Sequence, residues 1–204
     1  MGRPTPTALL IDLDGVLRRW DPAVVTDIEV RRGLKPGAVL DAAMEWSRLQ
    51  PAITGRVGHA EWLAGVAAAL ADEYGSAAAA AVPEWQAYRG EVDADVLAFV
   101  REVRAAGVRV GLATNATDLL EADLEGLALT DQVDVVVSSA RLRTHKPTRE
   151  FFQQACLALE TPPDHVLFVD DTDRFVRGAR AAGLFAYRWS GAADLPYLRA
   201  ALGR

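Results

Sequence analysis

The chain has 204 residues, 50% of them hydrophobic and 25% charged, the balance of a soluble globular protein with room for one domain or one domain carrying an insertion. Acidic residues outnumber basic ones by 28 to 22, and the net charge of −6 counts against a nucleic-acid partner, because no basic surface would follow the phosphates. The one cysteine, Cys156, forms no internal disulfide, and no apolar run approaches the roughly 18 residues that span a bilayer, so we expect a cytoplasmic protein without a membrane partner.

An apolar run at 8–13 predicts a buried strand, and the region that follows it, 18–92, is of a different kind. This region contains no convincing strand but holds four of the five tryptophans. Its segments 36–49 and 59–74 have the spacing of amphipathic helices. We predict that 18–92 is an all-helical cap domain inserted into the chain, with three of its tryptophans in its core: Trp46, Trp62 and Trp85.

Strand and helix patterns alternate along the rest of the chain. Asp93 and Thr148 are placed to cap the helices that begin after them. Four more apolar runs predict strands: 108–113, 133–137, 166–169 and 184–187. The alternation predicts an α/β core made of 1–17 and 93–204, a Rossmann-like parallel sheet flanked by helices.

Polar residues stand at the carboxyl ends of three predicted strands. They are Asp12 and Asp14 after the first strand, Thr114 and Asn115 after the second, and Asp170 and Asp171 after the fourth. Lys146 comes just before the helix that Thr148 caps. Ligands of an open parallel sheet bind outside the carboxyl ends of its strands, so we expect these residues to meet. Each motif alone is most often a strand end, a helix cap or solvated surface, but all of them in this order indicate a functional site.

The chemistry of this set points to phosphoryl transfer. Carboxylates so close together repel one another unless a cation neutralises them, and oxygen ligands without His or Cys suit Mg²⁺. A carboxylate beside Mg²⁺ can attack a phosphoryl group to form an aspartyl-phosphate, while a second carboxyl group protonates the leaving oxygen and then activates water. Mg²⁺, a lysine and hydrogen-bond donors would stabilise the charge of the transferred group.

Four segments together carry a family resemblance. They are LIDLDGVL at 10–17, ATN at 113–115, HKP at 145–147, and LFVDD at 167–171 followed by GARAAG at 178–183. With them the chain resembles the haloacid dehalogenase (HAD) superfamily, in its phosphatase-type members that carry a helical cap after the first strand.

The resemblance implies the catalytic and metal-binding roles. Asp12 would be the nucleophile and Asp14 the general acid and base. The Asp12 carboxylate, the Asp14 backbone carbonyl and Asp171 would hold Mg²⁺.

The resemblance also implies how the phosphoryl group is bound. Thr114 and the Asn115 amide would contact its oxygens, while Lys146 would neutralise its charge and steady the nucleophile. Asp170 would orient Lys146 or a metal-bound water.

The expected function is that of a Mg²⁺-dependent phosphomonoester hydrolase acting on a small soluble phosphorylated metabolite, since a closed cap leaves no room for a polymer. A dehalogenase is disfavoured, because dehalogenating relatives usually lack the second acid, Asp14. Two alternatives stay open: a phosphomutase with the same residues, and a non-catalytic HAD-like binding protein.

One departure from the family pattern stands four residues after Asp171. Relatives usually carry Asn or Asp there, whereas this chain has Phe175. The polar contact is then missing or is supplied by Asp173, and such losses typically reduce metal affinity or activity by about 10–100-fold. Arg56 and His59 are candidates to face the cleft from the cap. The substrate, and whether the protein is a monomer or a homodimer, stay open.

Overall fold

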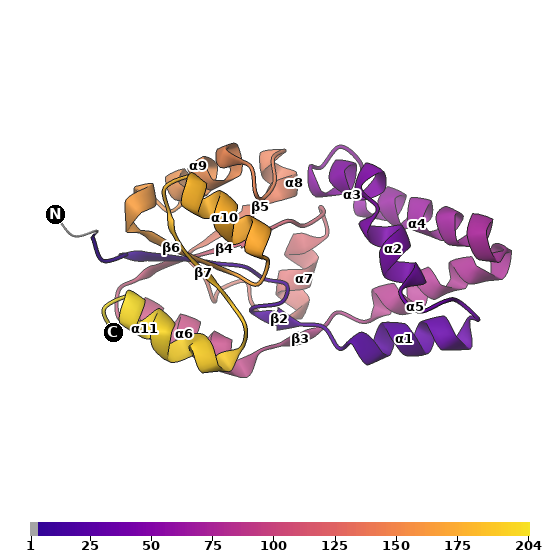
Figure 1. The fold of residues 1–204 in the computed structure, drawn as a ribbon, viewed down its shortest axis with the longest axis horizontal. Helices are drawn as coiled ribbons and strands as arrows, with labels where there is room; N and C mark the ends of the chain where they lie inside the picture. The colour runs from indigo at the N-terminus through magenta and orange to yellow at the C-terminus, as the bar shows by residue number, and fades with distance from the viewer. Residues whose placement is uncertain (1–3) are drawn as a thin grey trace.

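The core of the molecule is built around a parallel sheet. A computed structural model describes residues 4–204, so the first three residues of the predicted core segment lie outside the described residues. The strand order is β5-β4-β1-β6-β7, and every neighbouring pair is parallel (Figure 1). The strands are β1 (Ala8–Ile11), β4 (Arg109–Thr114), β5 (Val135–Ser138), β6 (Val166–Asp170) and β7 (Phe185–Arg188). All five predicted strands are present, with ends shifted by at most two residues, and the Rossmann-like fold class is confirmed.

Helices cover both faces of this sheet. They are α6 (Ala94–Ala105), α7 (Leu120–Gly126), α8 (Ser139–Leu142), α9 (Arg149–Ala158), α10 (Asp173–Ala181) and α11 (Leu195–Ala201). Because side chains alternate along a strand, Leu9 and Ile11 of β1 pack with α6, α7 and α11, while Leu10 packs with α9 and α10 on the other face. The predicted caps are confirmed: Asp93 accepts hydrogen bonds at the start of α6, and Thr148 does so at the start of α9.

A lobe of helices lies beyond the carboxyl edge of the sheet (Figure 1). Its helices are α1 (Pro22–Arg31), α2 (Ala38–Met44), α3 (Trp46–Ile53), α4 (His59–Tyr74) and α5 (Ala81–Ala87). They share a hydrophobic cluster of their own, drawn from residues between Ile28 and Val82. The single helix expected over 36–49 is wrong, because the extended Glu45 interrupts it and its carboxylate accepts a hydrogen bond from the Ser47 N–H to start α3.

Two points join the lobe to the core. At the first, β2 (Arg18–Arg19) pairs antiparallel with β3 (Glu91–Val92), so the expectation of no strand in 18–92 is wrong. A two-residue strand shows no apolar alternation, and it forms only because the chain leaves and re-enters the core side by side. At the second, Gly55 (φ 64°) lies against Ala140 of α8 so closely that a Cβ would stand 2.7 Å from the Ala140 carbonyl oxygen.

Short 3₁₀ segments complete the fold: η1 (Ser76–Ala80), η2 (Pro163–His165) and η3 (Ala192–Asp194). Between residues 4 and 204, no helix is both long enough and apolar enough to cross a membrane.

Candidate active site

A buried ion-pair cluster lies at the carboxyl edge of the sheet. Lys146 Nζ is 2.9 Å from Asp12 Oδ1 and 2.6 Å from Asp170 Oδ2. Lys146 is 1% exposed, Asp170 0% and Asp12 5%, so all three charges are shielded from bulk water. Because β1 lies between β4 and β6, Asp12 is flanked by the residues that end those two strands, as the sequence predicts.

The loop between α8 and α9 carries Lys146, and side chains from two strand ends fix its position. The Asn115 side chain donates to the Lys146 carbonyl oxygen at 3.1 Å and accepts from the Lys146 N–H at 2.8 Å. The second oxygen of Asp170 accepts a hydrogen bond from the Thr172 N–H. This bond fixes the orientation of the carboxylate that pairs with Lys146. The side-chain amide of Asn115 is therefore occupied, and phosphate contact by its backbone N–H and by buried Thr114 stays a prediction.

The nucleophile candidate presents one free oxygen. Asp12 Oδ1 accepts from Lys146 and, at 2.7 Å, from the Leu13 N–H, whereas Oδ2 has no hydrogen-bond partner within residues 4–204. Burial raises the pKa of Asp12 well above 3.8, Lys146 lowers it and Asp170 raises it again. Burial lowers the pKa of Lys146, but the two carboxylates outweigh burial and raise it above 10.5, so the ammonium stays charged.

Asp12, Asp170 and Asp171 bring ligand oxygens within 4.8 Å of one another. Three carboxylates face one ammonium group, so the ionised cluster has two negative charges in excess. Burial raises the pKa of Asp171, which a cation close by would oppose. An all-oxygen donor set with this excess charge fits a divalent cation such as Mg²⁺.

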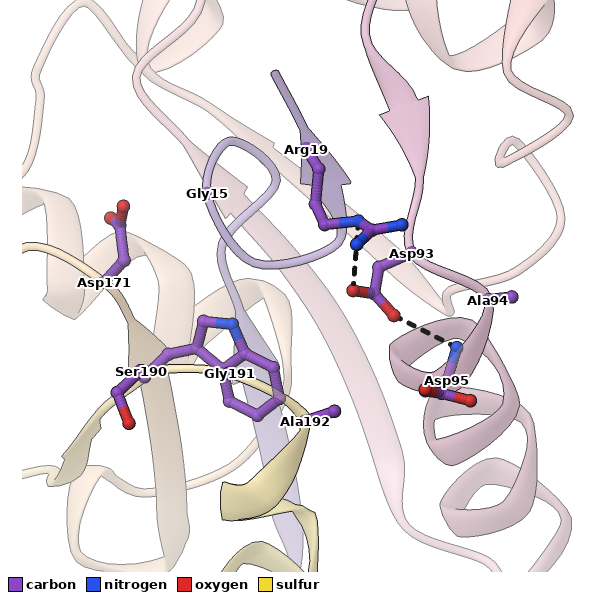
Figure 2. Close-up of a pocket in the computed structure, with 10 residues that line it drawn as sticks. Gly15, Arg19, Asp93, Ala94, Asp95, Asp171, Ser190, Gly191 and Ala192 are labelled. Carbon is purple, nitrogen blue, oxygen red and sulfur yellow. Dashed lines mark hydrogen bonds and ion pairs between the residues drawn. The ribbon is translucent and has the colours of Figure 1, made fainter. Parts of the chain in front are cut away.

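Asp171 also lines a cavity of about 490 Å³ on the core side of the cluster. Figure 2 shows Asp171 and the Gly15 loop on one side of this cavity and the Arg19–Asp93 ion pair on the other. Asp171 is thus the carboxylate of the cluster that borders an open, polar space, through which a hydrated cation can approach.

Gly15 makes room for Asp171. Its φ is +82°, and a Cβ there would stand 2.1 Å from Asp171 Oδ2. We expect Gly15→Ala to displace the Asp171 carboxylate and to raise the Mg²⁺ concentration that gives half-maximal activity by about 10–100-fold. Titration of activity with Mg²⁺ measures this shift.

Gly107→Ala is the matched control for this prediction. Gly107 has φ +86°, but a Cβ there meets nothing within 4 Å, so the variant carries the same backbone strain without the collision. Equal Mg²⁺ dependence in the two variants would contradict the assignment of Asp171 as a metal ligand.

Three donors hold the general acid candidate, Asp14. Arg18 Nε and Nη2 donate to its two oxygens at 2.7 and 3.1 Å, and the Trp20 indole donates at 2.7 Å. Arg18 is itself only 5% exposed and pairs with Asp123, which also pairs with Arg89. Nothing in the local sequence indicates this arrangement, because Arg18 and its partner Asp123 are 105 residues apart.

Phe175 takes the place of a polar contact. Lys146 Nζ lies 5.0 Å from the centroid of its ring, a cation–π distance. Asp173 does not replace the missing group, because its carboxylate pairs with Arg177 at 3.1 Å on the surface of α10. The cluster is therefore closed on this side by an aromatic ring.

A second cavity, of about 550 Å³, lies between the core and the helical lobe, and Asp14 and Asn115 form part of its wall. Trp62 and Trp85 pack with the cluster of the lobe as predicted, but Trp46 does not: it is 47% exposed and lines this cavity. The helical spacing of Trp46 is that of a core residue, yet the break at Glu45 turns it toward the core domain. His59 lines the cavity as well, whereas Arg56 does not.

A family model described as haloacid dehalogenase-like hydrolase matches residues 6–183. The chain belongs to this family. This HAD-like hydrolase is 39% identical over 95 residues to a phosphatase of Mycobacterium tuberculosis, covering 46% of this chain and 44% of that protein. It is 32% identical over 124 residues to a ribulose-1,5-bisphosphate 5-phosphatase of Halopiger xanaduensis, covering 59% of this chain and 48% of that protein. The chain spans about half the length of the curated relatives it matches.

Solved structures share the fold of the HAD-like hydrolase along nearly its whole length. A HAD family enzyme of Bacteroides thetaiotaomicron, solved with magnesium and inorganic phosphate, has a TM-score of 0.75 at 18% identity and covers 95% of this chain and 98% of its own. An L-2-haloacid dehalogenase has a TM-score of 0.73 at 17% identity and covers 98% and 100%. At these identities the likeness shows the fold alone, so the reaction has to be argued from the residues of the site.

Proposed function

We propose that this HAD-like hydrolase is a Mg²⁺-dependent phosphatase that cleaves small phosphate monoesters through an aspartyl-phosphate on Asp12. The observation that carries the proposal is the free Oδ2 of Asp12 beside the buried Lys146 ammonium, within a carboxylate cluster that fits a divalent cation. Both curated relatives are named as phosphatases, which supports the same reaction class.

The first half of the reaction transfers the phosphoryl group to the protein. Asp12 Oδ2 forms a bond to phosphorus as the ester P–O bond breaks, and the protonated Asp14 carboxyl gives its proton to the departing oxygen, which leaves as the alcohol. Lys146 opposes the effect of burial on the pKa of Asp12 and holds the carboxylate in place. A bound Mg²⁺, held by the Asp12 carboxylate, the Asp14 backbone carbonyl and Asp171, would supply charge neutralisation at the phosphoryl oxygens.

The second half regenerates Asp12. The Asp14 carboxylate, now ionised, takes a proton from a water molecule as the water oxygen attacks phosphorus and the bond to Asp12 breaks, releasing inorganic phosphate. To reach the leaving oxygen in the first half, Asp14 has to break some of its hydrogen bonds to the two Arg18 nitrogens and the Trp20 indole. Because Arg18 and Trp20 lie at the junction of core and lobe, we assign them the role of positioning Asp14.

We expect Asp14→Asn to separate the two halves. With 4-nitrophenyl phosphate, whose leaving group needs no proton, the variant releases about one nitrophenol per protein molecule in a burst and then turns over slowly. With an alkyl phosphate kcat falls by about 10²–10⁴-fold without a burst, because the first half now lacks its acid. Stopped-flow absorbance measures the nitrophenolate burst, and rapid quenching with assay of the released alcohol measures the alkyl ester; a burst of equal size with both esters would contradict the acid role of Asp14.

Phosphate release from a panel of small monoesters, with Mg²⁺ and with EDTA, tests the proposed function. We expect turnover that requires Mg²⁺. A protein that interconverts phosphate esters without releasing phosphate is a mutase, and one that releases chloride from L-2-chloropropionate but no phosphate is a dehalogenase. A folded protein that turns over neither is a binding protein, and each of these three results would refute the proposal.

A further inference from the structure

The cavity between core and lobe borders the catalytic site, since the general acid candidate Asp14 and Asn115, whose side chain holds the Lys146 backbone, belong to its wall. Its volume of about 550 Å³ lies in the range typical of small-molecule sites. Any substrate whose phosphate reaches Asp12 from the lobe side places its organic group here.

Aromatic side chains dominate the wall of this cavity. They come from both halves of the molecule: Trp20, Trp46, Trp62, Trp85, Tyr88 and Phe175. Two of them lie close to the loop that carries the site lysine: Trp46 packs against His145 with ring centroids 5.2 Å apart, and the ring of Phe175 faces Lys146 Nζ. A ring attached close to the phosphate therefore meets Trp46 from the lobe and Phe175 from the core.

Apolar exposure is concentrated at the same place. Among residues 4–204, seven large hydrophobic side chains are exposed, and four of them line this cavity: Trp20, Leu40, Met44 and Trp46, at 39–52% exposure. Single exposed apolar residues are ordinary, but their clustering around one cavity indicates a surface that a ligand covers.

Charged and polar groups of the wall are mostly engaged with each other. Arg18 pairs with Asp14 and Asp123, and Arg89 pairs with Asp123. The Tyr88 hydroxyl accepts from the Asp21 N–H at 3.0 Å. A sugar hydroxyl or a second phosphate bound here would give up its water and find few free partners, which disfavours it.

His59 and Arg174 are two further polar residues of the cavity wall. Burial lowers the pKa of His59, and its Nδ1 is 2.8 Å from Thr117 Oγ1. Its Nε2 is buried without a hydrogen-bond partner among residues 4–204, so this wall offers a single neutral ring nitrogen there rather than a charged group. Arg174 has no ion pair within residues 4–204, but it is exposed, and its guanidinium lies 5.3 Å from the centroid of the Phe175 ring. One exposed arginine at the edge does not make a binding site for a second phosphate.

We propose that the substrate is a phosphate monoester whose organic group is an apolar ring system, held between Trp46 and Phe175, and not a sugar phosphate or bisphosphate. The assignment rests on the proposed phosphatase function. It separates this protein from the relative named for ribulose-1,5-bisphosphate, whose substrate carries hydroxyls and a second phosphate.

The test compares esters that share an alkoxide leaving group, so that intrinsic reactivity does not decide the result. We expect kcat/KM for 2-phenylethyl phosphate to exceed that for glucose 6-phosphate and ribulose 1,5-bisphosphate by about 100-fold or more. Ethyl phosphate, which has no ring, serves as the reference for the phosphoryl site alone.

Trp46→Ala supplies the second measurement. Trp46 is 47% exposed and lies outside the cluster of the lobe, so its removal leaves the fold in place. We expect KM for 2-phenylethyl phosphate to rise about 10-fold, and by a larger factor than KM for ethyl phosphate, which has no ring to lose. Tyr197→Ala is the matched control, because Tyr197 is a 64% exposed aromatic on α11 and outside this cavity.

The outcomes distinguish the two proposals. Efficient turnover of sugar phosphates with no preference for the ring, or an unchanged KM in Trp46→Ala, overturns the substrate assignment and leaves the phosphatase standing. Absence of phosphate release from every ester overturns the proposed function, and the substrate assignment with it.

Discussion

Asp12→Asn is expected to lower phosphate release by at least about 10³-fold, because the amide cannot act as the nucleophile. The effect falls on kcat, since the substrate still meets the lobe cavity. Asparagine keeps an oxygen that can accept from the Leu13 N–H, and Lys146 keeps its pairing with Asp170, so the fold survives. Steady-state phosphate release with 2-phenylethyl phosphate measures the loss, and thermal unfolding of both proteins reports on the fold.

Asp131→Asn is the matched control for the nucleophile. Asp131 is exposed, and its side chain makes no hydrogen bond or ion pair within the described chain, so the same chemical change there leaves kcat unaltered. Acid-stable trapping adds a second readout: phosphate bound covalently to protein should appear with the unaltered chain and be absent in Asp12→Asn. Covalent phosphate in Asp12→Asn at the unaltered level would mean that another residue is the nucleophile.

The sheet and the ion-pair cluster could be predicted because both depend on short stretches of chain. A strand covered on both faces must be apolar nearly throughout, so 8–13 and 166–169 are visible without further context. Parallel strands end at one edge, so Asp12 and Asp170 had to come close together once the strands were found. Two carboxylates buried side by side require a cation, and Lys146 supplies it through its salt bridges to both.

Features that the sequence does not reveal depend on contacts between segments far apart in the chain. Arg18 belongs to a charged segment of the kind that is usually solvated. Only the approach of α7, which supplies Asp123, buries Arg18. Trp46 has the spacing of a core residue, but the interruption at Glu45 sends it to the cavity. Phe175 departs from the usual polar residue, yet its contact with Lys146 involves a loop 29 positions earlier. Local periodicity contains no information on such pairings.

Lys146→Met is expected to have the largest effect on stability. Lys146 is 1% exposed and pairs with two buried carboxylates, so its loss leaves Asp12 and Asp170 facing each other without a cation. Removing one partner of a buried ion pair lowers the free energy of unfolding by about 3–5 kcal/mol. Phosphatase activity is also lost, since nothing then steadies Asp12. Urea unfolding at pH 7 measures the change in stability.

Two further variants identify the cause. Lys35→Met removes the other lysine of the chain, whose partner Glu73 is exposed, and we expect no measurable change in the free energy of unfolding. The double variant Lys146→Met/Asp170→Asn removes one of the two uncompensated charges, and asparagine still accepts a hydrogen bond from the Thr172 N–H. We therefore expect it to regain much of the free energy of unfolding that Lys146→Met loses. Activity does not return, because the cation beside Asp12 is still absent. Full additivity of the two substitutions would show that packing, and not the pairing of Lys146 with Asp170, is what the lysine contributes to the fold.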